Sequence, residues 1–468
     1  MNTILQQIAD NYTDFFDYAL GNILDKESNI EFSEIMKDFQ DFQNAMGVVF
    51  IEHLLKTLDE KIYEDVRKQR TYHIKEKSRE RTVIIPQGAV TYHRRYYKHK
   101  ETGEHVHLLD QLIGWNPSQR IDPYCASTIV EHALSMSYAK AASIGSSAAI
   151  SRQTVKNLVH KLPIPPNTLQ QEITAVSSER IYIEVDEDHV SLQDGRNIQM
   201  KLATIYTDKI AVGKNRTELQ NKHSFTGLES PDEFWSQIDA YIARAFKGLP
   251  KVYIIGDGAA WIKKGLECIP NSQFVLDKFH LLKYIRKICG NYSPNKALRY
   301  LINDEQEKFI ALVSQFKEKH PERILAITSG ETYVLNQWEY ARRALLESNI
   351  HSSTEGHVSH ILSARLSSRP LGWSTRGAET IAKLRVLHDN RESVKAFVLE
   401  SYKSRNTNIW GPLMSQSIVS AAKAHKTKKR KTIPYNNYLA DQAASIPGSE
   451  AGSNAWLRKI KKGGFGHF

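Results

Sequence analysis

The first 66 residues repeat apolar positions at the spacing of an α-helix. From residue 32 onward, apolar side chains recur three and four residues apart. They are Phe32, Ile35, Met36, Phe39 and Phe42, followed by Val49, Ile51, Leu54, Leu55 and Leu58. Side chains at this spacing share one helix face, which must pack against a core or another helix. We therefore predict a helical N-terminal region over residues 1–66.

The pattern changes at residue 67, where a basic β-rich region over 67–112 is predicted. Residues 81–86 and 89–97 alternate as strands do, and Gln87 and Gly88 between them suit a tight turn. Residues 67–100 hold eleven Lys and Arg but two Glu. Arg94 and Arg95, interleaved with tyrosines, could bind DNA phosphates. A hairpin with a basic solvated face is the alternative, and the nearby histidines show no metal-ligand spacing.

Residues 113–166 predict a helix-turn-helix. A short helix over 138–144 precedes Gly145, and Ser151 is suited to capping a second helix whose apolar stripe includes Val155 and Val159. This leaves the first turns of the second helix polar. The exposed candidates for contacts to DNA bases are Arg152, Gln153 and Lys156. Residues 163–166, rich in proline, then form a linker.

Strand and helix patterns alternate from residue 178 to 400. Short apolar strands are predicted over 181–185, 198–206, 252–255 and 274–276, with an amphipathic helix over 234–246. This alternation predicts an α/β domain with parallel strands. Residues from about 286 to 350 are helical and charged, as an insertion would be, and residues 401–468 form a basic C-terminal region and tail.

Composition narrows the function classes. The 468 residues exceed one typical core, and 63 Lys and Arg against 52 Asp and Glu give a net charge of +11. A basic balance favours a polyanionic partner such as DNA. The three cysteines lack C-x-x-C spacing, which disfavours a disulfide framework or a cysteine zinc site. No apolar run reaches the length of a membrane span and no secretory signal is visible, so we expect a cytoplasmic protein.

Two carboxylates follow buried strand patterns. Asp186 comes after residues 181–185, and Asp257 comes after residues 252–256. Acids at the ends of neighbouring parallel strands lie close together, and they repel unless a cation lies between them. Oxygen ligands of this kind suit Mg²⁺ or Mn²⁺. The alternative is that each acid caps a helix or solvates a loop.

A third acid is needed to hold two ions, and Glu355 is the candidate. It opens a predicted helix over 355–365. With Ser352 three residues earlier it also fits a capping box, which would make it structural. Asp188, Glu184, Asp277 and Glu379 are the other candidates for the third ligand.

Several motifs together resemble the ISLre-type insertion-sequence transposases, a transposase-like family within the DDE transposases. They are residues 151–155 (SRQTV), 181–188 (IYIEVDED), 255–258 (IGDG), 276–280 (LDKFH), 354–358 (TEGHV) and 365–374 (RLSSRPLGWS). The pair Asp277 and His280 is also similar to a motif of Mutator-like transposases. The likeness runs from about residue 67 to 390.

This resemblance implies an RNase H-like catalytic core over 178–400 that carries the helical insertion. It implies that Asp186, Asp257 and Glu355 hold two Mg²⁺ or Mn²⁺ ions for phosphoryl transfer on double-stranded DNA, with Asp186 bridging both. His280 would contact the scissile phosphate or orient the site, although a structural histidine is an open alternative. Further implied features are DNA-phosphate contacts by Arg365 and Arg369, a homodimer or higher oligomer on DNA, and a place at the bacterial nucleoid.

Two other functions remain open at this stage. A nuclease of the same fold would hydrolyse DNA without joining it, but it has no need of an N-terminal DNA-reading region. A DNA-binding regulator could retain the fold without activity, but all three candidate acids are present.

Overall fold

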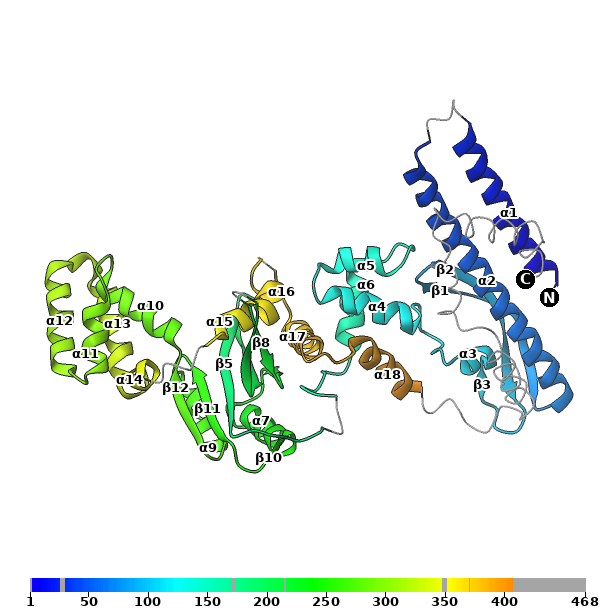
Figure 1. The fold of residues 1–468 in the computed structure, drawn as a ribbon. Helices are drawn as coiled ribbons and strands as arrows, with labels where there is room; N and C mark the ends of the chain where they lie inside the picture. Colours follow the sequence, from blue (N-terminus) through cyan, green and yellow to red (C-terminus); the bar gives the residue numbers. More distant parts are fainter. Residues whose placement is uncertain are drawn as a thin grey trace. The chain divides into compact units, whose positions relative to one another are not determined.

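The computed structural model describes residues 2–25, 30–169, 173–213, 216–346, 352–369 and 371–406. The chain divides into two compact units. Unit 1 contains residues 1–126 and 143–150 together with the described residues from 402 onward, and unit 2 contains residues 127–142 and 151–401. Figure 1 shows their elements. The basic cluster at 428–431 and the tail that follows it lie outside the described residues.

Unit 1 begins with two long helices followed by an antiparallel hairpin. Its elements are α1 (Asn2–Leu24), α2 (Phe32–Gln69), β1 (Tyr72–Ile85), β2 (Gly88–His99), β3 (His105–Val106) and α3 (Leu108–Ile113). Ile85 pairs with Gly88, which places the tight turn where the sequence predicts it. Leu55 and Ile62 of α2 pack with Val83 and Val90 of the hairpin in one core cluster. The hairpin extends beyond the predicted strands at both ends.

Three helices follow unit 1's sheet along the chain. They are α4 (Pro123–Ala133), α5 (Tyr138–Gly145) and α6 (Arg152–Lys161). The Ser151 hydroxyl accepts a hydrogen bond from the Thr154 backbone N–H at 3.1 Å, so the predicted N-cap of α6 is confirmed. Val155 and Val159 are buried, as the apolar stripe of this helix requires.

Unit 2 is built on a five-stranded mixed sheet in the order β12-β11-β5-β6-β9. These strands are β5 (Arg180–Ser191), β6 (Asn197–Tyr206), β9 (His223–Gly227), β11 (Lys251–Gly256) and β12 (Ser272–Leu276). β12, β11 and β5 are parallel, while β6 and β9 continue the sheet in antiparallel fashion. Two small sheets pair β4 (Val176–Ser177) with β10 (Phe246–Lys247) and β7 (Asp208–Gly213) with β8 (Arg216–Gln220). The predicted mixture of helices and parallel strands is confirmed.

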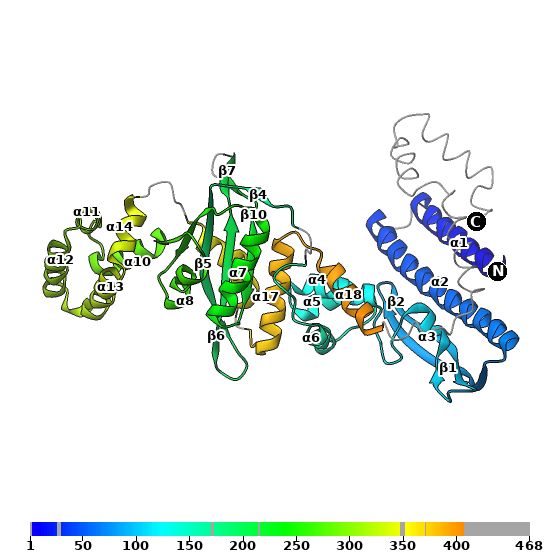
Figure 2. The same ribbon diagram turned by 90° about the horizontal axis from the view of Figure 1, so that it is seen from below.

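The two faces of β5 have opposite character because successive side chains of a strand alternate. Ile181, Ile183 and Val185 belong to the buried core that includes residues of α7 (Pro231–Ala245). Glu184 and Asp186 occupy the other face. Both ribbon views place α7 alongside the sheet (Figures 1 and 2).

Helices make up the rest of unit 2. Between β11 and β12 lie α8 (Ala260–Lys263) and α9 (Gly265–Cys268), and the helical stretch after β12 confirms the predicted α-helical region. It comprises α10 (Lys278–Cys289), α11 (Asn295–Ile302), α12 (Gln306–Lys319), a 3₁₀ turn (Pro321–Arg323), α13 (Ile324–Asn336) and α14 (Trp338–Leu346). Then follow α15 (Thr354–His357), a π-helix (Val358–Ser363), α16 (Ala364–Leu366), α17 (Thr375–Asp389) and α18 (Val394–Asn406). Among the described helices, none combines the length and apolar character that a bilayer crossing requires.

Candidate metal centre

Three side chains that are far apart in the sequence converge in unit 2. Asp186 of β5, His280 of α10 and Glu355 of α15 each place one ligand atom within 4.8 Å of the others'. Asp186 and His280 are half-buried, whereas Glu355 is exposed. Asp186 and His280 are therefore partly shielded from solvent, and the cluster is open to solvent at Glu355.

The sheet explains where Asp186 lies, and here one sequence interpretation was wrong. Asp186 does not end a strand, because β5 continues to Ser191 and stays paired with β6. The parallel ladder between β5 and β11 stops earlier, at the pair formed by Glu184 and Ile255. Asp186 thus lies two residues past the last residue of β5 that pairs with β11.

Asp257 follows β11 directly, as predicted, and its loop is held at two atoms. Its carboxylate accepts a hydrogen bond from the Ala259 N–H at 2.9 Å, and its carbonyl oxygen accepts one from the Tyr333 hydroxyl at 2.6 Å. Asp257 is not part of the group within 4.8 Å. It is nevertheless close enough for its charge to raise the pKa of Asp186.

Asp186 lies in an environment that disfavours its negative charge. Burial raises its pKa to about 6, and the charges of Asp257 and Glu355 add to this rise. The backbone N–H of Glu187, which donates to Asp186 at 2.8 Å, and the nearby His280 act in the opposite direction. Carboxylates that crowd together in this way are stabilised as anions by a bound cation.

His280 is oriented by a buried carboxylate. Asp277 caps α10, and its Oδ2 lies 2.8 Å from Nδ1 of His280. This hydrogen bond raises the pKa of His280 against the effect of burial, and the charge of Asp186 adds to the rise. With Nδ1 engaged, Nε2 is left for the cluster, an arrangement in which metal-binding histidines are often held by a carboxylate. The spacing of Asp277 and His280 at the start of a helix was the sequence signal for this pair.

Glu355 lies in α15, where no capping box forms. Ser353 is the N-cap of this helix and its side chain makes no capping hydrogen bond, so the capping-box interpretation was wrong. Glu355 instead faces Asp186 and His280. The alternative acid, Glu379, lies on α17, where the charges that act on it are those of Lys383, Glu229 and Arg376.

The residues present fit a divalent ion. Two carboxylates and one imidazole provide oxygen and nitrogen ligands, a set that suits Mn²⁺ well and that Mg²⁺ shares through its oxygens. Burial, with the charges of Asp257 and Glu355 adding to it, raises the pKa of Asp186, and a bound cation would favour the charged form of this carboxylate. No such fit exists for a thiolate-bound zinc, because no cysteine belongs to the cluster.

Comparison with known proteins identifies the family. Residues 26–401 match the model of an uncharacterised protein family, UPF0236. The chain belongs to the UPF0236 family. It is 32% identical over 446 residues to UPF0236 protein TTE2489 of Caldanaerobacter subterraneus subsp. tengcongensis, covering 92% of this chain and 94% of that protein. A second relative from this bacterium is 33% identical over 447 residues, with 92% of each chain covered, and its name joins eleven locus labels.

In this UPF0236 chain the predicted base-reading residues lie on α6. Arg152 and Gln153 are exposed, and Lys156 is half-buried. The C-terminal end of the helix is fixed within unit 2, because Arg376 of α17 donates hydrogen bonds of 2.8 Å to the carbonyls of His160 and Leu162. The N-terminal turn thus remains open to solvent on a well-held helix.

Two arginines of the basic hairpin are not free to bind phosphate, which corrects their assignment. Arg94 is 6% exposed and is ion-paired with the buried Asp110. Arg95 pairs with Asp59 and Glu60, and its guanidinium lies 4.5 Å from the Tyr63 ring centre. Burial lowers the pKa of Arg94 to about 10, with Arg81 contributing. These side chains stabilise the fold of unit 1.

The assignment of Arg365 as a DNA-phosphate contact is also corrected, because its side chain is buried, whereas Arg369 is exposed. Arg365 is 7% exposed and donates a hydrogen bond of 2.9 Å to the Ala133 carbonyl. Its guanidinium lies over the Trp373 ring at 4.7 Å and near the Tyr138 ring at 5.6 Å. The motif that contains both arginines therefore contributes packing through one and a solvent-facing charge through the other.

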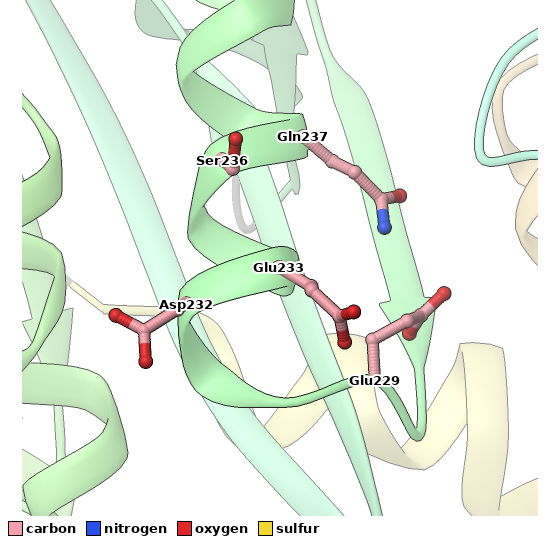
Figure 3. Close-up of a pocket in the computed structure, with 5 residues that line it drawn as sticks. All are labelled: Glu229, Asp232, Glu233, Ser236 and Gln237. Carbon is pink, nitrogen blue, oxygen red and sulfur yellow. The ribbon is translucent and has the colours of Figure 1, made fainter.

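A separate pocket opens at the start of α7 (Figure 3). Its lining residues are Glu229, Asp232, Glu233, Ser236 and Gln237. Glu233 is engaged in the capping box of α7 with Ser230, and Glu229 pairs with Lys383. None of the lining residues belongs to the Asp186 cluster, so this pocket is distinct from the candidate metal centre.

Proposed function

We propose that this protein is a DNA transposase of an insertion sequence, which cuts the ends of its element and joins them to target DNA by metal-dependent phosphoryl transfer. The observation that carries this proposal is the convergence of Asp186, His280 and Glu355, with Asp257 beside them. Three acids from three segments would be the ligand set that two-metal phosphoryl transfer needs.

The sheet supports an RNase H-like core. The first long strand, β5, lies at its centre; on one side follow β6, antiparallel to β5, and β9, antiparallel to β6, and on the other side follow the parallel strands β11 and β12. This is the strand order expected of such a core, with the first acid on the central strand and the second after its parallel neighbour. The helices α10–α14 between β12 and α15 correspond to the insertion that the resemblance implies.

Each residue of the centre has a distinct part in the proposed chemistry. Asp186 and Glu355, with His280, would hold one Mg²⁺ or Mn²⁺ ion, and Asp186 with Asp257 would hold a second. When bound, the ions lower the pKa of the attacking water or DNA 3′-hydroxyl and neutralise charge on the leaving oxygen. Asp277 holds the His280 ring in one orientation. The exposed side of the cluster, where Glu355 lies, is where a DNA backbone would approach.

Two further observations support DNA mobility over other metal-dependent chemistry. The net charge of +11 and the exposed Arg152 and Gln153 of α6 suit a DNA partner. Relatives present at many loci of one bacterium are what an element that moves or copies itself produces. Since two element ends must be held together for joining, we expect a homodimer or higher oligomer on DNA.

A nuclease of the same fold and an inactive DNA-binding regulator are the two competing functions. The three acids and the oriented histidine favour activity over the regulator. The helix α6, with its polar exposed turn, favours a protein that selects its DNA over a general nuclease.

One experiment separates the three functions by product. The full-length protein is incubated with Mg²⁺ or Mn²⁺ and labelled DNA that carries both ends of its own element, together with a target plasmid. Cut ends that become joined to the plasmid support a transposase; cut but never joined ends indicate a nuclease; bound and uncut DNA indicates a regulator. Glu355→Gln, purified in parallel, is the control for contaminating nucleases and should give neither product.

A further inference from the structure

Glu184 is a buried carboxylate of β5, two residues before Asp186 and on the same face of the strand. Its side chain is 1% exposed, which is rare for a glutamate unless cations or hydrogen-bond donors surround it. Glu184 makes no direct contribution to the ligand cluster. Its contacts instead run to the segment that carries Glu355.

Four groups converge on the Glu184 carboxylate. Oε1 accepts hydrogen bonds from the Tyr206 hydroxyl at 2.7 Å and from the Lys209 ammonium at 2.9 Å. Oε2 accepts one from the Ser353 backbone N–H at 3.0 Å and lies 3.1 Å from Nδ1 of His357. Burial alone would raise the pKa of Glu184, but His357 and Lys209 outweigh it and lower the pKa to about 2.

These contacts bracket Glu355. Ser353 precedes it by two residues and His357 follows it by two, so both ends of the single turn α15 are tied to one carboxylate of β5. Lys209 adds a third contact to this segment, because its ammonium also donates a hydrogen bond to the Ser353 hydroxyl at 3.0 Å. Ser353, the N-cap of α15, makes no side-chain capping hydrogen bond. The acceptors at the start of this turn are the Glu184 carboxylate, for the Ser353 N–H, and the Ser352 hydroxyl, for the Thr354 N–H at 3.2 Å.

The chain beyond α15 is fixed as well. The next segment, Val358–Ser363, is a π-helix, a rare form that occurs mostly as short stretches within α-helices and frequently at functional sites. The Arg385 guanidinium of α17 donates hydrogen bonds to the carbonyls of His360 and Ile361 within it. Glu355 is therefore carried on a short turn that is held on both sides by contacts from other elements.

We propose that Glu184 is a positioning residue: it clamps α15 so that Glu355 meets Asp186 at a fixed distance, and it thereby sets the affinity of the centre for its metal ion. This inference rests on the proposed function, because it takes Glu355 to be a ligand. The alternative is that the Glu184 contacts stabilise the fold and leave the metal affinity unaffected.

The test measures Mn²⁺ binding to the full-length protein by calorimetry, alongside thermal unfolding. Glu184→Gln keeps the shape of the side chain but removes its negative charge. His357→Leu removes the contact between the half-buried His357 and the Glu184 carboxylate. Each should weaken Mn²⁺ binding by about 10–100-fold, the usual effect of removing groups that hold metal ligands in place. His357→Asn, whose amide nitrogen can replace Nδ1 as a donor, should restore most of the affinity.

Glu392→Gln is the matched control. Glu392 accepts hydrogen bonds from Leu169 N–H at 2.6 Å and the Thr168 hydroxyl at 3.0 Å in unit 2, and neither partner is a residue of the metal centre. This variant should bind Mn²⁺ like the wild type. Wild-type affinity in Glu184→Gln, or no recovery in His357→Asn, overturns the proposal. If Glu184→Gln does not fold, His357→Leu and His357→Asn decide it alone.

A wild-type protein that does not bind Mn²⁺ contradicts the proposed function instead of the clamp. The clamp is then decided by hydrogen exchange of the amides of residues 353–357. Faster exchange in Glu184→Gln than in Glu392→Gln supports a clamp on α15, and equal exchange overturns it.

Discussion

Two aspartates, the buried Asp110 of unit 1 and the half-buried Asp186 of unit 2, have opposite surroundings. Asp110 of unit 1 is ion-paired with Arg81 at 2.7 Å and with Arg94, and the Tyr92 hydroxyl lies 3.5 Å away. Asp186 of unit 2 has the acids Asp257 and Glu355 near it and a pKa of about 6. The first aspartate is paired with two arginines, whereas the second has two acids and one histidine, His280, near it.

Two histidines repeat the contrast. Burial, together with the charge of Arg94, lowers the pKa of His107 in unit 1 to about 4. The hydrogen bond with Asp277 raises the pKa of His280 in unit 2. A neutral histidine beside arginines serves packing, whereas a histidine oriented by a carboxylate toward other acids is suited to binding a cation.

The contrast shows how to distinguish a carboxylate whose ion pairs stabilise the fold, such as Asp110, from a carboxylate that is suited to binding a cation, such as Asp186. In unit 1 the two buried arginines beside Asp110 are both ion-paired with it, so removing this aspartate costs folding free energy. Around Asp186 the negative charges exceed the positive ones, so removing one acid costs binding and chemistry instead. Four substitutions test this distinction, from the largest expected effect to the smallest.

The largest effect is expected for Asp186→Asn. Strand cleavage should fall by at least about 10³-fold, roughly 4 kcal/mol in activation free energy, while affinity for DNA and the unfolding temperature stay close to wild type. The physical reason is that the amide cannot hold the cation that the crowded carboxylates need. Single-turnover cleavage and a gel-shift titration measure the two quantities. Cleavage within about tenfold of wild type would falsify the metal assignment.

Asp110→Asn should instead destabilise unit 1. Two buried guanidinium groups lose their counter-charge, which costs about 3–5 kcal/mol of unfolding free energy. Hydrogen exchange of the β1 and β2 amides reports this locally. Asp194→Asn, at an exposed ion pair with Arg196, is the control and should leave exchange unchanged. Wild-type protection in Asp110→Asn would mean that the buried pairs do not hold the hairpin.

His107 gives the stability of unit 1 a pH dependence. Its pKa is 6.5 when unperturbed and about 4 in the fold, so the unfolded chain binds the extra proton between these values. Stability is therefore full above about pH 6.5 and declines as the pH falls toward 4, by on the order of 2–3 kcal/mol. Hydrogen exchange of β2 against pH should show this slope, and His107→Gln should flatten it. The exposed His189→Gln serves as the control; an unchanged slope in His107→Gln would assign the pH dependence elsewhere.

The smallest effect concerns DNA selection by α6. Arg152→Ala should weaken binding to the element's ends by about 1–3 kcal/mol more than binding to random DNA, the contribution expected of a contact to a base edge. Arg391→Ala removes another exposed charge from unit 2 and should not change the ratio of the two affinities. Equal losses on both DNAs for Arg152→Ala would make it a phosphate contact.

Local features of this protein were predictable from its sequence. The turn at Gln87 and Gly88, the N-cap at Ser151 and the strand before Asp257 each depend on a few consecutive residues. The same is true of Asp277 and His280, three residues apart at the start of α10. Periodicity and capping act within one or two turns of chain, so a single segment contains the information that specifies them.

The long-range pairings could not be predicted, and they decide which charged residues are available. Arg94 and Arg365 resemble exposed basic residues in the sequence, but the fold buries both against distant partners. β5 extends past Asp186 because β6 pairs with it, although its apolar run ends at Val185. Burial depends on which segments meet, and this is a property of the whole fold.

The sequence by itself thus determined the mixed α/β class, the caps and turns, and the order of Asp186, Asp257 and Glu355 along the chain. Only the tertiary structure brought His280 into the cluster with Asp186 and Glu355 and removed the capping explanation for Glu355. It also joined Glu184 to Ser353 across 169 residues of chain. The physical reason is that electrostatic and hydrogen-bond contacts depend on distance in space, and local sequence patterns do not encode that distance over such separations.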